Sequence, residues 1–225
     1  EANLTEDQKK GCEMGKKGYM TNLYHFGGVG HFVMNYEKLL RVGYQRLIAE
    51  AEGYLAALDQ ADSEYVEKKE FYEAMLIELR AACTYINRYA ELAKQRSSQE
   101  ENPVRKKELQ QIAANCRQVA GGPAKTMWQA IQLWHFATTI TLIESNGHSV
   151  SYGRMDQWLY PYYKSDMENH IISKEFAQEL LECAYVKMGN PSKLKDRMTV
   201  KVRNGRGWGG ESLTIGGVNE RGEDV

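Results

Sequence analysis

Apolar residues recur at steps of three and four along most of the chain, which is the spacing of amphipathic helices. The first such pattern predicts a helix from Met34 to about Leu58, with Asn35 as its N-cap. Asp62 and Ser63 then open the strongest helical pattern of the chain. Its inward face is predicted to consist of Phe71, Met75, Leu79, Ala82, Ile86, Tyr89 and Ala93.

Two further helical segments follow this long pattern. Val104 to about Val119 forms a more polar helix, which is expected to pair antiparallel with its predecessor across the turn at Pro103. The glycines and the proline at 121–123 then break the chain. Residues 125–145 are apolar on nearly every side, a pattern that is typical of a helix buried on most of its faces.

The last third of the chain changes from helical patterns to strand patterns. The segment GRMDQWLYPYYKSDMENH is expected to be helical up to the region of Pro161, and Ser173 is expected to cap a helix that runs through Lys187. The β-branched residues at 198–203 and 212–218 predict two strands on either side of a glycine-rich loop.

Together these elements predict an α/β fold. Helices in series that end in strands are typical of one lobe of a larger α/β enzyme, so the first short strands of its sheet are expected near the C-terminal end. Residues 1–30 are weakly periodic and are expected to form a loop. Because the first residue is glutamate rather than methionine, residues 1–225 are expected to be a piece of a longer protein.

Composition excludes several classes of protein. The net charge is −1 with both signs interspersed, so the chain offers no electrostatic footprint for nucleic acid or an anionic membrane. The most apolar segment, 127–143, contains glutamines, threonines and a histidine, which argues against a membrane span. The four cysteines are far apart and lack CxxC or zinc-finger spacing. They are interpreted as reduced thiols of a cytoplasmic protein, and no metal site is expected.

The segment LIESNGHSVSYGR places many hydrogen-bonding groups at the end of the predicted buried helix. His148 and Ser149 could bind substrate oxygens there, or they could cap the last carbonyl groups of the helix. His31, in the loop GGVGHF, has a side chain that titrates near neutral pH and could protonate an oxygen. The alternative for His31 is a structural role at the start of the following helix.

Other polar residues are interpreted as structural. Arg154 and Asp156 are close enough in sequence to form an ion pair. Cys12 lies near lysines but has no further mark of a nucleophile. The glycine-rich segment GRGWGG lacks the GK[ST] ending of a phosphate-binding P-loop, which argues against a nucleotide site.

The segments ESNGHSVSYGRMDQWLYPYYKSDMENH, AQELLECAYVKM and SLTIGGVNERGED are very similar, in this order, to the pyruvate formate-lyase-like domain of the glycyl radical enzymes. The segments GVGHFVMNYEKLLRVGYQRLIAEA and FYEAMLIELRAACTYINRYAELA resemble the same family, so the resemblance covers most of the chain. It implies the mostly helical N-terminal portion of a ten-stranded α/β barrel. It also implies a cytoplasmic homodimer, with a bacterial microcompartment as a further location.

The resemblance also implies the chemistry of the whole protein. A partner activating enzyme that uses S-adenosylmethionine and an iron–sulfur cluster would install a glycyl radical, which generates a thiyl radical on a cysteine inside the barrel. Both radical residues would lie C-terminal to the GGVN motif. Residues 1–225 are therefore expected to be a partial pyruvate formate-lyase-like domain, without a directly bound cofactor and inactive alone.

Within the family, the chain resembles the glycerol and propane-1,2-diol dehydratases at its GVGH and ESNGHS segments. This resemblance implies that His31 protonates the departing C2 hydroxyl of a small diol, and that His148 and Ser149 bind the substrate hydroxyls. The implied roles agree with a physical argument, because a leaving hydroxide needs a proton donor and a buried diol needs partners for its oxygens. Choline, isethionate, hydroxyproline and arylacetate lyases are the alternatives, as is a non-catalytic helical interaction module.

Overall fold

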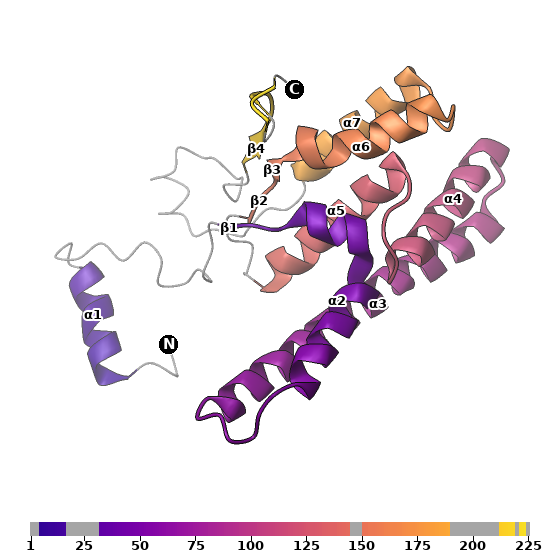
Figure 1. Ribbon diagram of the computed structural model, residues 1–225. Helices are drawn as coiled ribbons and strands as arrows, with labels where there is room; N and C mark the ends of the chain where they lie inside the picture. The colour runs from indigo at the N-terminus through magenta and orange to yellow at the C-terminus, as the bar shows by residue number, and fades with distance from the viewer. Residues whose placement is uncertain (1–4, 17–31, 145–149, 190–211, 219–220, 224–225) are drawn as a thin grey trace.

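The computed structural model describes residues 5–16, 32–144, 150–189, 212–218 and 221–223 (Figure 1). Its helices are α1 (Glu6–Lys16), α2 (Tyr36–Ala56), α3 (Tyr65–Gln99), α4 (Pro103–Val119), α5 (Met127–Glu144), α6 (Met155–Glu168) and α7 (Lys174–Met188). Its strands are β1 (Phe32–Val33), β2 (Val150–Ser151), β3 (Gly153–Arg154) and β4 (Leu213–Thr214). No helix in these ranges is long and apolar enough to cross a membrane.

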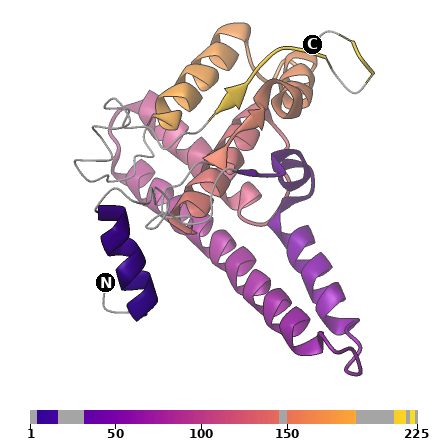
Figure 2. The same ribbon diagram turned by 90° about the vertical axis from the view of Figure 1, so that its left-hand side faces the viewer.

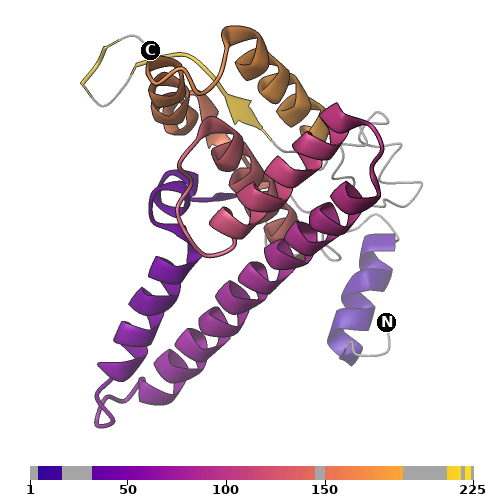
Figure 3. The same ribbon diagram turned by 90° about the vertical axis from the view of Figure 1, so that its right-hand side faces the viewer.

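Helices α2, α3, α4, α6 and α7 pack around α5. Helices α3 and α4 lie antiparallel and share an extensive interface, which confirms the pairing predicted across Pro103, and α2 lies along the first half of α3 (Figures 2 and 3). Helix α5 contacts α4, α6 and α7. Because Met127, Leu133 and Trp134 of α5 are almost completely buried, the prediction of a helix covered on most faces is confirmed.

Polar side chains at the interface of α4 and α5 are paired with one another. The amide nitrogen of Asn115 donates to Oε1 of Gln132 at 2.8 Å, and Oδ1 of Asn115 accepts from Nε2 of Gln111, also at 2.8 Å. Since an unpaired buried amide would be costly, these hydrogen bonds offset the cost of placing Asn115 and Gln132 inside the helix interface.

Helix α2 begins as predicted and is then interrupted by a kink. The side chain of Asn35 accepts a hydrogen bond from the backbone nitrogen of Lys38 at 3.0 Å, which confirms the predicted cap. Gly43 has φ 74° and ψ 169°, outside the helical region. A Cβ atom on Gly43 would lie 2.3 Å from the carbonyl carbon of Gly122. Only glycine therefore allows the loop at 121–123 to pack against the kink.

The predicted inward face of α3 is only partly buried. Ala82, Ile86 and Ala93 are buried as predicted, whereas Phe71 and Tyr89 are 61% and 43% exposed. The first half of α3 packs against α2 in a hairpin that projects from the other helices (Figure 3). Because α2 is the neighbour of this half of α3, it buries a narrower face of α3 than several helices would, and Phe71 lies outside that face.

Helix α6 continues past Pro161, where the sequence prediction ended the helix. Proline removes one helical N–H group, and the exposed ring of Pro161 is accommodated on the outer side. The additional turn carries Asp166 to the start of α5, where its Oδ2 accepts the N–H of Met127 at 2.7 Å. Ser173 caps α7 as predicted, by accepting the N–H of Phe176 at 3.1 Å.

The strands differ from the prediction in position and length. Strand β4 lies within the predicted strand 212–218 but is only two residues long, and 198–203 lies outside the described residues. Strands β1, β2 and β3 have no counterpart in the sequence prediction, so the expectation that the first strands fall near the C-terminal end is wrong. The loop predicted for 1–30 is also wrong at α1. A strand of two residues is too short to show the alternation from which strands are predicted.

Candidate functional site

Two pairs of parallel strands join segments that are far apart in sequence. Strand β1 pairs with β2, with Phe32 opposite Val150, and β3 pairs with β4, with Gly153 opposite Leu213. The first pair links the segment after the GVGH loop to the segment after ESNGHS. The second pair links the GRMDQ segment to the GGVN segment.

The three residues predicted to contact substrate, His31, His148 and Ser149, lie outside the described residues. Their neighbours in the chain are described. Phe32 directly follows His31, Val150 directly follows Ser149, and these two neighbours are the paired residues at the start of β1 and β2.

Buried aromatic side chains lie beneath the first strand pair. The ring of Tyr152, between β2 and β3, meets the ring of Trp134 edge-on at a centroid distance of 5.1 Å, and Nε1 of Trp158 donates to the Tyr152 carbonyl at 3.2 Å. Tyr36, three residues after β1, lies 5.7 Å from Trp158 between ring centroids. Burial raises the pKa of Tyr36 to about 12. These side chains form a closely packed support for both strands.

Arg154 and Asp156 connect the start of α6 to the segment after β4. Nε of Arg154 lies 3.4 Å from Oδ1 of Asp156, and Nη1 of Arg154 donates to the carbonyl of Val218 at 3.4 Å. Oδ2 of Asp156 accepts the N–H of Gly216 at 2.9 Å. Gly216 and Gly217 have φ 76° and 97°, a conformation that favours glycine.

The electrostatics of this connection keep Asp156 ionised. Burial alone would raise the pKa of its carboxyl, but the Arg154 guanidinium and the N–H of Gly216 outweigh burial, so the pKa lies below its usual range. Arg154 and Asp156 therefore hold the GRMDQ segment against the GGVN segment, which the sequence prediction treated separately. Asp156 and its partner Gly216 are separated by 60 positions in the chain.

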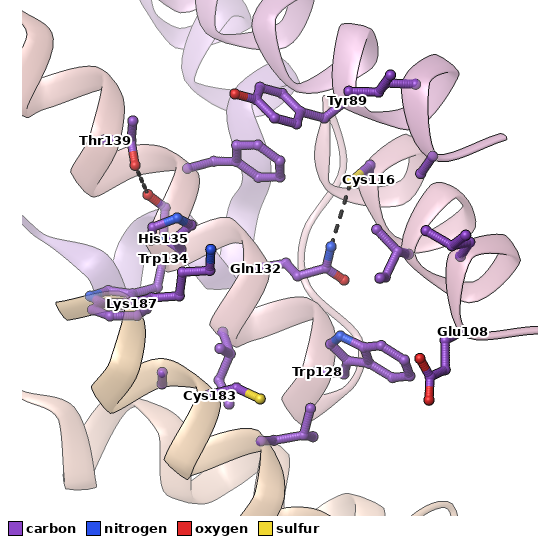
Figure 4. A pocket seen from close by; sticks show the side chains of 18 of the residues that line it. Tyr89, Glu108, Cys116, Trp128, Gln132, Trp134, His135, Thr139, Cys183 and Lys187 are labelled. Carbon is purple, nitrogen blue, oxygen red and sulfur yellow. Dashed lines mark hydrogen bonds between the residues drawn. The ribbon is translucent and has the colours of Figure 1, made fainter. Parts of the chain in front are cut away.

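A groove of about 660 Å³ lies between α3, α4, α5 and α7 (Figure 4). Its aromatic lining consists of Tyr85, Tyr89, Trp128, Trp134, Phe136 and Phe176. Gln132 points into the groove and its Nε2 lies 3.5 Å from Sγ of Cys116 (Figure 4). Burial, with a contribution from the charge of Lys187, lowers the pKa of His135 and so favours its neutral form. The groove is suited mainly to apolar contact, and two charged residues of its lining, Arg105 and Glu108, form an ion pair with each other at 2.7 Å.

The described residues contain no evident nucleophile or metal site. Cys83, Cys116 and Cys183 are free thiols, and the side chain of Cys12 is outside the described part of the protein. Burial raises the pKa of Cys116 to about 11, so its thiol stays protonated at neutral pH. No group of three or more His, Cys, Asp or Glu side chains in the described ranges could hold a metal ion.

Sequence reasoning missed the contact between Tyr36 and Thr138, whose hydroxyl oxygens are 2.9 Å apart. The two residues are 102 positions apart, so no local spacing connects them. The available signal was the presence of threonines in a largely apolar helix, because a buried hydroxyl needs a partner.

Comparison with known proteins identifies the relatives of this chain. The sequence profile of the family described as "Pyruvate formate lyase-like" matches residues 1–225. The (2S)-3-sulfopropanediol dehydratase of Klebsiella oxytoca is 58% identical over 224 residues, which cover 100% of this chain and 27% of the relative. The chain spans about a quarter of the length of the curated relatives it matches.

Solved structures agree with this relationship. The glycerol-bound form of the B12-independent glycerol dehydratase from Clostridium butyricum is 35% identical with a TM-score of 0.85, and the match covers 98% of this chain and 31% of that one. A glycyl radical enzyme from Archaeoglobus fulgidus is 29% identical with a TM-score of 0.79, over 88% of this chain and 25% of that one. The chain therefore belongs to the pyruvate formate lyase-like family of the glycyl radical enzymes.

Proposed function

We propose that the whole protein is a glycyl radical dehydratase that removes water from a small 1,2-diol by cleaving a C–O bond. The observation that carries the proposal is the pairing of Phe32 with Val150. It joins the residue after His31 to the residue after Ser149, and neighbouring Cα atoms are only about 3.8 Å apart along the chain. Two segments suited to bind the oxygens of one small substrate thus lead into one strand pair.

Each of these side chains has a role that the chemistry requires. His31 protonates the hydroxyl that leaves C2, so that water rather than hydroxide departs. His148 and Ser149 hydrogen-bond the substrate hydroxyls, which would otherwise lose their partners on leaving water. The glycyl radical, on a glycine beyond this chain, supplies the one-electron chemistry after installation by an activating enzyme that uses S-adenosylmethionine and an iron–sulfur cluster.

The surrounding assembly belongs to the same proposal. The chain would form the N-terminal portion of a ten-stranded α/β barrel in a cytoplasmic homodimer, with a bacterial microcompartment as a further location. Arg154 and Asp156 would be structural, because their bonds to Val218 and Gly216 hold the GGVN segment against the start of α6.

Among 1,2-diols, a sulfonated propanediol is the first substrate to test. The relative that is 58% identical is a (2S)-3-sulfopropanediol dehydratase, whereas the glycerol dehydratase of known structure is 35% identical. Glycerol and propane-1,2-diol are the next candidates. Isethionate, choline, hydroxyproline and arylacetates represent the other radical lyases, and a non-catalytic helical module would act on none of these compounds.

The test uses the full-length protein, activated anaerobically and supplied with each of these compounds separately. The proposal expects an aldehyde product from at least one diol, and a loss of turnover of roughly 10² or more for His31→Ala. His170→Asn is the matched control, because His170 is exposed in the turn between α6 and α7 and its φ of 54° is one that asparagine also tolerates, so turnover should not change. Full activity of His31→Ala would exclude the acid role, and no product from any diol despite a complete glycyl radical signal would exclude the function.

A further inference from the structure

The side chain of Tyr36, at the junction of β1 and α2, is hydrogen-bonded to the side chain of Thr138 in the middle of α5. Tyr36 is 1% exposed, Thr138 is 2% exposed, and their hydroxyl oxygens are 2.9 Å apart. Oγ1 of Thr138 also lies 2.8 Å from the carbonyl of Trp134, one turn earlier in α5. A threonine hydroxyl has one hydrogen, and the Trp134 carbonyl can only accept it. The Tyr36 hydroxyl is therefore the donor to Thr138.

A second threonine of α5 contacts the same junction. Oγ1 of Thr141 lies 3.0 Å from Sδ of Met34 and 2.9 Å from the carbonyl of Ala137. Thr138 and Thr141 are three positions apart, so they lie on the same face of the helix. Helix α5 thus contacts the β1–α2 junction at two points, at Met34, which directly follows β1, and at Tyr36, three residues after β1.

The same helix leads into the other strand of the pair. The chain continues from Glu144 at the end of α5 through the NGHS segment to Val150 at the start of β2. Strand β1 is consequently held twice, by backbone pairing with β2 and by the threonine face of α5. A closed arrangement of this kind leaves β1 little freedom to shift along β2.

We propose that Tyr36 and Thr138 are positioning residues, whose hydrogen bond sets the distance between the two segments that carry the substrate-binding side chains. The inference rests on the proposed function, in which His31 precedes β1 and His148 and Ser149 precede β2. Neither Tyr36 nor Thr138 touches the substrate. Without their bond, the junction after β1 keeps only the weaker contact of Met34 with Thr141, and the acid at the start of β1 loses its alignment with the C2 hydroxyl.

The expected effect lies in catalysis more than in stability. A displacement of about 1 Å at a reacting group can cost on the order of 10² in rate, so Tyr36→Phe and Thr138→Val should lower kcat/KM by roughly tenfold to a hundredfold. Most of this loss should appear in kcat, because the bond holds the strand that follows the proposed acid. Since both variants remove the same bond, the double variant should be no worse than the poorer single variant.

Matched variants separate positioning from folding. Thr139→Val removes the same kind of bond to the preceding turn, 2.8 Å from Oγ1 to the His135 carbonyl, without touching the β1–α2 junction. Tyr44→Phe removes the hydroxyl of the other buried tyrosine of α2. Thr138→Ser keeps the hydroxyl and should restore kcat/KM. All variants are made in the full-length protein, and each carries a complete glycyl radical by electron paramagnetic resonance before assay.

The assay measures kcat and KM with (2S)-3-sulfopropanediol and with glycerol, together with the temperature of unfolding. The proposal expects Tyr36→Phe and Thr138→Val to lose kcat while the two controls keep it, with similar unfolding temperatures in all four. Unchanged kcat/KM in Tyr36→Phe, or a loss fully explained by a lower unfolding temperature, would overturn the positioning role and leave the dehydratase intact. A wild-type protein that carries the radical but converts none of the three diols, propane-1,2-diol included, would instead overturn the proposed function, and the positioning role with it.

Discussion

Replacing Gly43 by alanine tests whether the kink in α2 is locked by the loop at 121–123. The backbone of Gly43, with φ 74° and ψ 169°, lies in a region that is essentially restricted to glycine. A Cβ atom would lie 2.3 Å from the carbonyl carbon and 2.5 Å from the carbonyl oxygen of Gly122, and 2.7 Å from that of Gly121. These neighbours are backbone atoms, so no side-chain rotation can relieve the overlap.

Two costs add up in this variant. A non-glycine residue in such a conformation loses roughly 1–3 kcal/mol, and overpacking against fixed neighbours loses roughly 1–3 kcal/mol more. The loop is also bound to α2 by two backbone hydrogen bonds, from Gln45 to Gly121 at 2.8 Å and from Ala124 to Leu40 at 2.9 Å. We therefore expect Gly43→Ala to lower the free energy of unfolding by roughly 2–6 kcal/mol.

The measurement is urea unfolding followed by circular dichroism, with Gly53→Ala as the control. Gly53 lies in the same helix and a Cβ atom there would meet nothing within 4 Å. Alanine should raise stability at Gly53 by roughly 0.5–1 kcal/mol, because glycine has the larger entropy to lose in a helix. If Gly43→Ala were as stable as wild type, the loop would be free to move and the kink would not depend on close backbone packing.

Two further predictions concern the carboxylates of Asp166, which is buried, and Asp156, which is partly exposed. Burial raises the pKa of Asp166, so the folded state binds a proton at this carboxyl more tightly than the unfolded state does. The resulting gain in stability is present below about pH 4, the usual pKa of an aspartate, and is lost as the pH rises through the raised pKa. Asp166→Asn removes this titration. In urea titrations, the free energy of unfolding of the wild type minus that of the variant should therefore decrease as the pH rises through this range. A difference that stays constant with pH would contradict the prediction. Asp156→Ala should accelerate amide hydrogen exchange at Gly216, because the carboxylate that accepts its N–H is lost, while exchange within α7 should stay unchanged. The same exchange rate at Gly216 in variant and wild type would show that the turn is stable without this hydrogen bond.

The helices of the fold were largely predictable because their signals are local. The caps Asn35 and Ser173 accept the expected backbone N–H groups, and the apolar segment at 125–145 is the buried α5. Helix α1 was missed because its sequence is polar and weakly periodic, so it lacks the apolar stripe on which the prediction depended. The kink at Gly43 was missed because the helical pattern continues on both sides of it.

The candidate site was predictable only where neighbours in sequence are neighbours in space. The spacing of Arg154 and Asp156 suggested their ion pair, but their bonds to Val218 and Gly216 join positions that no periodicity relates. The same holds for the strand pairs, in which two-residue strands meet across long stretches of chain. Roles for His31, His148 and Ser149 came from resemblance to the family and stay predictions.

The pairing of β1 with β2 also constrains the order in which the chain can fold. The bond between Tyr36 and Thr138 closes a loop of 102 positions, which costs roughly 4 kcal/mol of chain entropy if the intervening residues are unfolded. The α3–α4 hairpin lies within this loop and needs only local contacts, so it should form first and shorten the loop. During synthesis, β1 emerges long before its partner and waits with Phe32 and Val33 unpaired. Because β1 has only two residues, its unpaired edge offers other nascent chains little backbone to pair with during this interval.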